Sequence, residues 1–218
     1  MPPDALVFDL DGTIVDTEAP EFEATRVVWA DHGLELTMGH WQQFIGTARF
    51  DWVADLERAA GTQVDRAAAE RTRRHVHAEL IEHQGARPGV VELMVAAGLA
   101  GLPVAVASNA PEAWVVHHLD RLGLDRHVSA VRAIEHVVRG KPWPDVYLAA
   151  CAAVGTIPER SVAFEDSITG VTAAKAAGLF TVAAPHALSA LHDLSAADLL
   201  VVSLAAVSLE TLAVGWPS

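Results

Sequence analysis

This sequence of 218 residues has one cysteine, few lysines, an excess of acidic over basic residues and no long apolar run. The single Cys151 excludes an intramolecular disulfide framework and a zinc site built from cysteines. Acidic residues number 28 against 15 basic ones, and the net charge of −13 disfavours binding to nucleic acid or an anionic membrane. The apolar runs fall short of the ~20 residues that a membrane span requires. The first residues lack the basic segment of a signal peptide, so we expect a cytoplasmic protein.

Only two of the basic residues are lysines, Lys141 and Lys175. Arginine therefore serves wherever a generic surface cation suffices. A lysine that remains is a candidate for a site that needs a compact ammonium group. Lys141 lies in a loop sequence with glycine and proline, whereas Lys175 lies among alanines in a predicted helix. We therefore expect Lys141 to be functional and Lys175 to be a solvated helical residue.

Short apolar segments typical of strands buried on both faces of a parallel sheet recur along the chain. They are residues 5–8, 102–107, 130–134, 162–164, 180–183 and 199–202. Helical patterns that end at glycines lie between them, at about 111–122, 144–154 and 170–177. This alternation predicts the α/β class, with a doubly wound, mostly parallel Rossmann-like sheet.

The alternation stops between residues 16 and 86, where the pattern is helical throughout. Three of the six tryptophans lie in this stretch, which gives it an apolar core of its own. We therefore expect an α/β core domain formed by residues 1–15 and 87–218, and an inserted all-helical domain formed by residues 16–86. The sequence leaves the oligomeric state open and is compatible with a monomer.

Reactive side chains follow four of the predicted strands, at the carboxyl ends where open α/β sheets bind ligands. They are Asp9 and Asp11 after the first strand, Ser108 and Asn109 after the second, Lys141 after the third, and Glu165 and Asp166 after the fourth. Four crowded carboxylates cannot all stay ionised unless a cation shares the site. Oxygen ligands without histidine or cysteine favour Mg²⁺, which recruits phosphate oxygens, so a small phosphorylated substrate follows.

The chemistry of phosphoryl transfer fits these residue types. Gly12 permits a turn directly after Asp11, which swings the Asp11 carboxylate back over the site. One aspartate of the first strand end can then attack phosphorus while the other serves as general acid and base. Ser108 and Asn109 precede a helix whose N-terminus offers backbone N–H groups to an anion. Lys141 can neutralise the phosphoryl oxygens.

In these motifs the sequence resembles the haloacid dehalogenase-like superfamily. The motifs occur in order as Asp9–Asp16 (DLDGTIVD), Ser108-Asn109, Lys141-Pro142, and Glu165–Ser167 followed by Gly170. The resemblance covers essentially the whole chain, and the combined pattern is highly specific. It implies an enzyme, a phosphoric monoester hydrolase with an inserted cap domain that closes over the site and excludes water.

The resemblance also implies a role for each catalytic candidate. Asp9 would form an aspartyl-phosphate, and Asp11 would protonate the leaving oxygen and then activate water. Ser108 and Lys141 would hold the phosphoryl group. The expected surroundings of Mg²⁺ are Asp9, the backbone carbonyl of Asp11, Glu165 and Asp166.

Within the superfamily, the sequence is most similar to the β-phosphoglucomutase-like group of sugar-phosphate phosphatases and mutases. Asp11 argues against the dehalogenase branch, and the lack of lysine in residues 16–86 excludes the Schiff-base chemistry of phosphonoacetaldehyde hydrolases. Glu21 stands where the mutases have a histidine, and Ala110-Pro111 follows the second motif where they carry a lysine. We therefore expect a phosphatase. The alternatives are a phosphomutase and a catalytically idle binding protein.

Substrate contacts are expected from both domains. The segment Gly46–Arg49 resembles a cap loop in which an arginine meets the distal part of the substrate. The expected substrate-binding residues are Gly12, Thr13, Asn109, Arg49 and Glu18. The sequence thus predicts a Mg²⁺-dependent phosphatase for a small phosphorylated metabolite such as a sugar phosphate.

Overall fold

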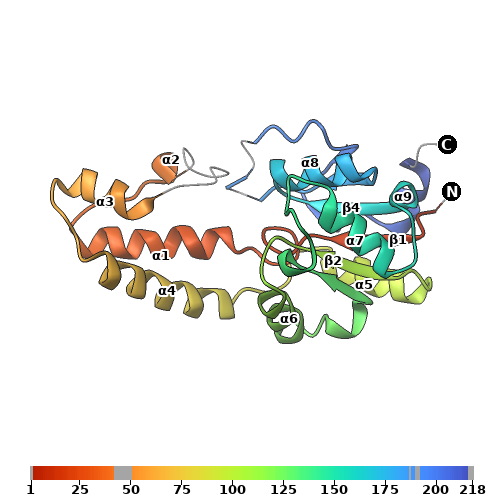
Figure 1. Ribbon diagram of the computed structural model, residues 1–218, viewed down its shortest axis with the longest axis horizontal. Helices are drawn as coiled ribbons and strands as arrows, with labels where there is room; N and C mark the ends of the chain where they lie inside the picture. The colour runs from red at the N-terminus through yellow and green to blue at the C-terminus, as the bar shows by residue number, and fades with distance from the viewer. Residues whose placement is uncertain (1, 42–50, 187, 190–191, 216–218) are drawn as a thin grey trace. The chain divides into compact units, whose positions relative to one another are not determined.

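The computed structural model describes residues 2–41, 51–186, 188–189 and 192–215. The chain divides into two compact units (Figure 1). Met1–Val15 and Gly85–Ser218 form an α/β unit, and Asp16–Gln84 form a helical unit inserted into it.

Among the described residues, six parallel strands form one sheet in the order β3-β2-β1-β4-β5-β6. The strands are β1 (Ala5–Phe8), β2 (Val104–Ala107), β3 (Ala130–Arg132), β4 (Ser161–Glu165), β5 (Phe180–Ala183) and β6 (Leu199–Leu200). The predicted doubly wound α/β class is confirmed. The third strand is shorter than expected, because Ile134 begins the 3₁₀ turn η2 (Ile134–His136).

Helices cover both faces of the sheet (Figure 1). They are α5 (Val90–Leu99), α6 (Glu112–Arg121), α7 (Asp145–Ala153), α8 (Ile168–Ala177) and α9 (Leu209–Gly215), with further 3₁₀ turns η1 (Asp125–His127), η3 (Pro158–Arg160) and η4 (Leu204–Ala206). Leu6 and Phe8 of β1 share a buried cluster with α5, α6 and α9. Val7 shares another with α7 and α8. Because side chains alternate along a strand, β1 is buried from both sides.

The sequence predicted the ends of α6, α7 and α8 but not the presence of α5. Gly123, Gly155 and Gly178 follow the three predicted helices with positive φ angles, as helix-ending glycines do. In α5, apolar residues lie on both faces: Val90 is buried, while Val91 is 41% exposed. A helix that is apolar all round shows no clear period of 3.6 residues, so its pattern gave no signal.

The strand order reverses beside β1. The chain places β2 and β3 on one side of β1 and then crosses to place β4 on the other. Ligands in open α/β sheets bind at such a reversal, outside the carboxyl ends of the strands. Phe8 and Phe164 are paired in register and stack with ring centroids 4.4 Å apart. This stack fixes the ends of β1 and β4 side by side, at the residues directly before Asp9 and Glu165.

The helical unit contains α1 (Glu18–Asp31), α2 (Met38–Trp41), α3 (Trp52–Ala60) and α4 (Arg66–Glu82). Its described residues contain no strand, as the sequence predicted. Helices α1 and α4 pack against each other, and an ion pair between Glu21 and Arg73 joins them. The side chain of Asp65 accepts a hydrogen bond from the N–H of Ala68 at 2.9 Å and so caps α4. In the part of the chain that the structure describes, no helix has the length and apolar character needed to cross a membrane.

Candidate active site

Asp9 is the first residue after β1, and its side chain is buried. Its backbone N–H donates to the carbonyl of Phe164 at 3.0 Å, which continues the pairing of β1 with β4 beyond the strand. Burial raises the pKa of the Asp9 carboxyl well above its usual value, and Glu165 adds to this, whereas Lys141 opposes it. A buried carboxylate of this kind needs a cation to stay ionised.

Lys141 supplies one such cation. Its Nζ atom forms an ion pair with Asp9 and lies 2.6 Å from Oε1 of Glu165. Burial alone would lower the pKa of Lys141, but the two carboxylates outweigh it and the pKa is raised. The ammonium group therefore stays charged although its side chain is only 4% exposed.

Asn109 fixes the loop that carries Lys141. The backbone N–H of Lys141 donates to Oδ1 of Asn109 at 2.7 Å, and Nδ2 of Asn109 donates to the carbonyl of Lys141 at 3.1 Å. Gly140 lets this loop approach, since a Cβ there would overlap the Asn109 amide. In the structure the side-chain amide of Asn109 binds the Lys141 loop, and its predicted role at the substrate stays a prediction.

Glu165, the last residue of β4, accepts hydrogen bonds at both carboxylate oxygens. Oε1 accepts from Lys141 and, at 2.6 Å, from the hydroxyl of Tyr147. Oε2 accepts from the N–H of Asp166 at 3.2 Å and from the hydroxyl of Ser167 at 3.1 Å. The side chain is fully buried. These donors hold the Glu165 carboxylate in one orientation, with Lys141 against it.

Asp166 is buried beside this group, and each of its carboxylate oxygens has one protein donor. The Thr13 hydroxyl donates to Oδ1 at 3.2 Å. Nε2 of His186 lies 3.2 Å from Oδ2. Burial raises the pKa of Asp166, while the hydrogen bond from His186 opposes the shift. Gly12 has φ +87°, and a Cβ there would overlap the Asp166 carboxylate. The glycine of the first motif therefore makes room for the carboxylate of the fourth.

Asp9, Glu165 and Asp166 form a group of buried carboxylates whose oxygens approach within 4.8 Å of one another. Oxygen donors at this spacing fit a hard divalent cation such as Mg²⁺. The raised pKa values of Asp9 and Asp166 support this fit, because a bound cation is what would keep both ionised. The residues present thus match the cation that the sequence predicted.

Ser108 and Asp11, two further predicted catalytic residues, lie at the same edge of the sheet. Ser108 directly follows β2, is buried, and accepts a hydrogen bond from the N–H of Ala110 at 2.9 Å. The N–H of Glu112 at the start of α6 donates to the Glu135 carboxylate at 3.1 Å. The helix start therefore offers fewer free N–H groups to an anion than the sequence suggested.

Asp11 lies in the turn after Asp9. Its Oδ1 atom accepts a hydrogen bond of 3.0 Å from the indole Nε1 of Trp114, on α6. This contact joins the end of β1 to the helix that follows Ser108.

The two substrate-binding residues predicted in the insertion, Arg49 and Glu18, belong to the helical unit. Arg49 lies outside the described residues. Glu18 is the first residue of α1, in the helical unit, where Oδ1 of Asp16 accepts a hydrogen bond from its N–H at 3.2 Å. Their roles at the substrate stay predictions.

Four residues that contact these site residues were not predicted from the sequence. They are Arg87, Trp114, Tyr147 and His186. Tyr147 is the only tyrosine of the chain, which was a usable signal, but its position fitted the apolar face of α7. Arg87 donates to the carbonyls of Gly12 and, at 3.0 Å, Ala184. Neither that contact nor the position of His186 follows from a motif.

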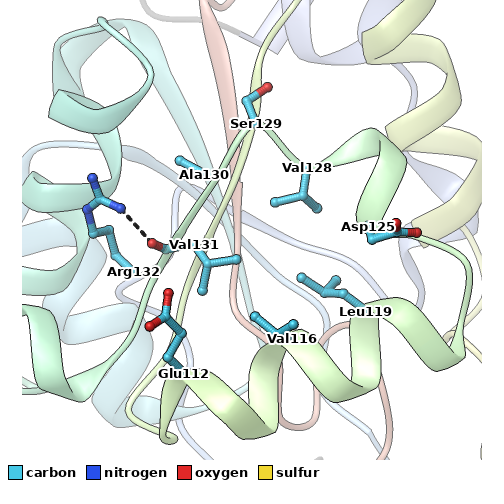
Figure 2. Close-up of a pocket in the computed structure, with 9 residues that line it drawn as sticks. All are labelled: Glu112, Val116, Leu119, Asp125, Val128, Ser129, Ala130, Val131 and Arg132. Atoms are coloured by element: carbon cyan, nitrogen blue, oxygen red, sulfur yellow. Dashed lines mark hydrogen bonds between the residues drawn. The ribbon is translucent and has the colours of Figure 1, made fainter.

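The structure also contains a cavity of about 310 Å³ between α6 and β3 (Figure 2). It is lined by Glu112, Val116, Leu119, Asp125, Val128, Ser129, Ala130, Val131 and Arg132. None of these is a predicted site residue. Arg132 donates to the carbonyl of its neighbour Val131 at 2.7 Å, and Glu112 lies 3.6 Å from Nε2 of His136. The charged groups of the cavity are therefore partly used within the protein.

Known proteins are similar to this chain over most of its length. The family model of haloacid dehalogenase-like hydrolases matches residues 3–178. YhcW of Bacillus subtilis, named as a candidate phosphatase, is 37% identical over 183 residues, which cover 84% of this chain and 83% of that protein. Hexitol phosphatase A of Escherichia coli is 36% identical over 185 residues, 81% of each chain. The crystal structure of a hydrolase of the same family from Deinococcus radiodurans, with bound phosphate and sodium, has a TM-score of 0.82 at 28% identity and covers 100% of this chain and 98% of that chain.

Proposed function

This chain belongs to the haloacid dehalogenase-like hydrolase family and is a phosphatase of that family, and we propose that it is a Mg²⁺-dependent enzyme that hydrolyses a sugar phosphate through an aspartyl-phosphate. The observation that carries this proposal is the placement of Lys141 between Asp9 and Glu165 in a buried site that also holds Asp166. Such a site binds a dianionic phosphoryl group only when its own carboxylates are neutralised.

The reaction would proceed in two steps. An oxygen of Asp9 attacks phosphorus, the bond from phosphorus to the substrate oxygen breaks, and Asp11 gives its proton to the departing alcohol. Water then attacks phosphorus, gives its proton to Asp11, and the bond to Asp9 breaks with release of phosphate. Ser108 and Lys141 would hold the phosphoryl oxygens during both steps.

Asp9 and Asp166 would hold Mg²⁺ together with the backbone carbonyl of Asp11. When bound, the cation would neutralise charge on the carboxylates and on the phosphoryl oxygens. Glu165 would stand close to it, but both of its oxygens already accept protein hydrogen bonds. Its main contribution would therefore be to orient Lys141.

The class of substrate is proposed from the similarity of this chain to relatives whose names state a substrate. Hexitol phosphatase A, which is 36% identical, is named for the phosphates of a sugar alcohol. The helical unit would act as a cap over the site, with Arg49 and Glu18 as its contacts to the distal part of a phosphorylated sugar. Water exclusion by such a cap would protect the aspartyl-phosphate until the alcohol has left.

Hydrolysis is favoured over transfer of the phosphoryl group to a second sugar hydroxyl. A mutase of this family carries a histidine near the position of Glu21. In this chain the Glu21 carboxylate forms an ion pair with Arg73 and joins α1 to α4. That contact supports a structural role for Glu21.

A substrate panel tests the proposal. We would measure phosphate release from p-nitrophenyl phosphate, hexitol 6-phosphates, hexose 6-phosphates and β-glucose 1-phosphate, with Mg²⁺ and with a chelator, and follow the sugar by NMR. We expect Mg²⁺-dependent phosphate release that is highest with a phosphorylated sugar or sugar alcohol. Isomerised sugar without phosphate release would identify a mutase, and no turnover of any compound would identify an idle binding protein.

The matched variant in that panel is Asp9→Asn, which keeps the size of the side chain but loses the attacking oxyanion. We expect its kcat to fall by several orders of magnitude, because covalent catalysis is lost. Retention of more than about a tenth of the activity would contradict the assignment of Asp9 as nucleophile.

A further inference from the structure

Trp114 lies outside the family motifs and contacts the proposed general acid, Asp11. We infer that Trp114 is a positioning residue, whose indole N–H holds Oδ1 of Asp11 at 3.0 Å and leaves Oδ2 as the oxygen that exchanges the proton. This inference rests on the proposed role of Asp11 as acid and base.

The direction of the hydrogen bond decides which oxygen carries the proton. An indole nitrogen donates and has no lone pair with which to accept, so the Oδ1 atom that faces it must be an acceptor. A proton on Asp11 is then favoured on Oδ2, because the carbonyl oxygen of a carboxyl group is a better acceptor than its hydroxyl oxygen. The side chain of Asp11 thereby presents its acidic oxygen in one direction only, instead of in two orientations that differ by a rotation of the carboxyl group.

The indole itself is held by its neighbours on the same face of α6. Trp114 and His118 are four residues apart, and their rings meet edge to face at 4.2 Å. His118 is fully buried, and Nε of Arg121 donates to its Nδ1 atom at 3.3 Å. A series of three side chains from one helix thus ends at Asp11. A ring supported in this way keeps its N–H in place while Asp11 gains and loses a proton.

In the first step of the proposed reaction, Asp11 transfers its proton to the departing substrate oxygen. The bond from phosphorus to the substrate oxygen breaks, the electron pair stays on that oxygen, and the proton of Asp11 Oδ2 forms the new O–H bond. A sugar alkoxide is a poor leaving group and depends on this proton. p-Nitrophenolate is stable as an anion and leaves without it. A misplaced Asp11 therefore slows cleavage of the sugar phosphate far more than cleavage of p-nitrophenyl phosphate.

The test is the ratio of kcat/KM for a hexitol 6-phosphate to kcat/KM for p-nitrophenyl phosphate, measured for wild type and Trp114→Phe. This ratio does not change when part of a preparation is unfolded, because the concentration of active enzyme cancels. We expect Trp114→Phe to lower kcat/KM about 10-fold for the hexitol phosphate and less than about twofold for p-nitrophenyl phosphate, in line with the cost of a lost hydrogen bond to a charged group.

Two control variants accompany it. Asp11→Asn removes the acid and should lower the same ratio further. Trp143→Phe changes a tryptophan that is 52% exposed and should leave the ratio unchanged. An equal loss on both substrates in Trp114→Phe, or no loss, would overturn the positioning role while leaving the phosphatase proposal standing. An unchanged ratio in Asp11→Asn, or a wild type that hydrolyses neither substrate, would overturn the proposed function and the inference with it.

Discussion

The Nζ atom of Lys141 lies 2.6 Å from Oε1 of Glu165, and the same ammonium group is ion-paired with Asp9. Lys141 comes from a loop, whereas the two acids end neighbouring strands of the sheet. Asn109, after β2, fixes the loop backbone through two hydrogen bonds. The position of one cation therefore depends on three strands and one loop.

The first prediction concerns the shape of that cation. We expect Lys141→Arg to lose ~2–4 kcal/mol of transition-state stabilisation, because a planar guanidinium does not fit between two buried carboxylates that share one compact ammonium. The matched control is Lys175→Arg. Lys175 is paired with Asp198 at 2.6 Å and is part-exposed, so an arginine can keep its ion pair. The measurement is kcat/KM of both variants at saturating Mg²⁺, and near-wild-type values for both would refute the prediction.

A second prediction concerns His186. Its Nδ1 atom accepts from the N–H of Leu188 at 3.2 Å, so the ring proton lies on Nε2 and is donated to Asp166. Residues that orient a metal ligand in this way contribute 10- to 100-fold to metal affinity in other proteins. We therefore expect His186→Ala to raise the Mg²⁺ concentration for half-maximal activity about 10-fold or more. His127→Ala, in η1, is the control. Equal Mg²⁺ titrations for His186→Ala and wild type would contradict the prediction.

The third prediction is a pH dependence of stabilisation by Mg²⁺. Burial raises the pKa of Asp9 and of Asp166 above their values in the unfolded chain. Such carboxyls cost no stability while they are protonated in both states. They reduce the stability of the metal-free protein as the pH rises from the unfolded pKa, about 4, through the folded pKa. Mg²⁺ binds the ionised form, so it should offset this loss.

The measurement for this third prediction is the Tm difference between Mg²⁺-loaded and chelator-treated protein. We expect it to be small near pH 4 and to grow toward about pH 7. Asp166→Asn should flatten the dependence, because one of the two titrating groups is gone. A difference that stays constant over this range in the wild-type protein would show that these carboxyls do not bind the cation.

A fourth prediction compares two helical glycines. A Cβ at Gly170, in α8, would overlap the Glu165 carboxylate, whereas a Cβ at Gly98, in α5, would meet nothing within 4 Å. Gly98→Ala should therefore stabilise the protein by ~0.5–1 kcal/mol through helix propensity. Gly170→Ala should instead lower the Tm and the activity, because it displaces the acid that orients Lys141. Denaturant unfolding and kcat/KM of the two variants check this, and matching effects at both positions would contradict it.

The positions of the strands and of the four motifs could be predicted from the sequence because each depends on short stretches of chain. Four apolar residues followed by Asp9 indicate a buried strand that ends in a polar group. The rule that parallel strands present their carboxyl ends at one edge then brings Asp9 and Glu165 together. Lys141 was found for a different reason, since the shortage of lysine made a loop lysine informative.

The residues that support the site could not be predicted in the same way. The hydrogen bond from Trp114 to Asp11 depends on how α6 is rotated against the end of β1, which no local pattern records. His186 reaches Asp166 because the chain after β5 stays beside the end of β4, where the N–H of Ala184 donates to the carbonyl of Glu165. Tyr147 lies on the apolar face of α7 and was correctly placed in the core, but its hydroxyl bonds to Glu165. Long-range contacts of single side chains thus separate the predicted from the observed site.

The strand order has a consequence for synthesis of the chain. Of the six strands of the sheet, β1 is translated first, yet all four of its residues are fully buried between β2 and β4 in the finished sheet. Its second neighbour does not exist until Glu165 has been translated. While the segment between β1 and β4 is being translated, the apolar strand β1 therefore has an unsatisfied pairing edge, the condition under which nascent chains aggregate or recruit chaperones. The same placement that puts Asp9 near the centre of the sheet delays the completion of the strand that carries it.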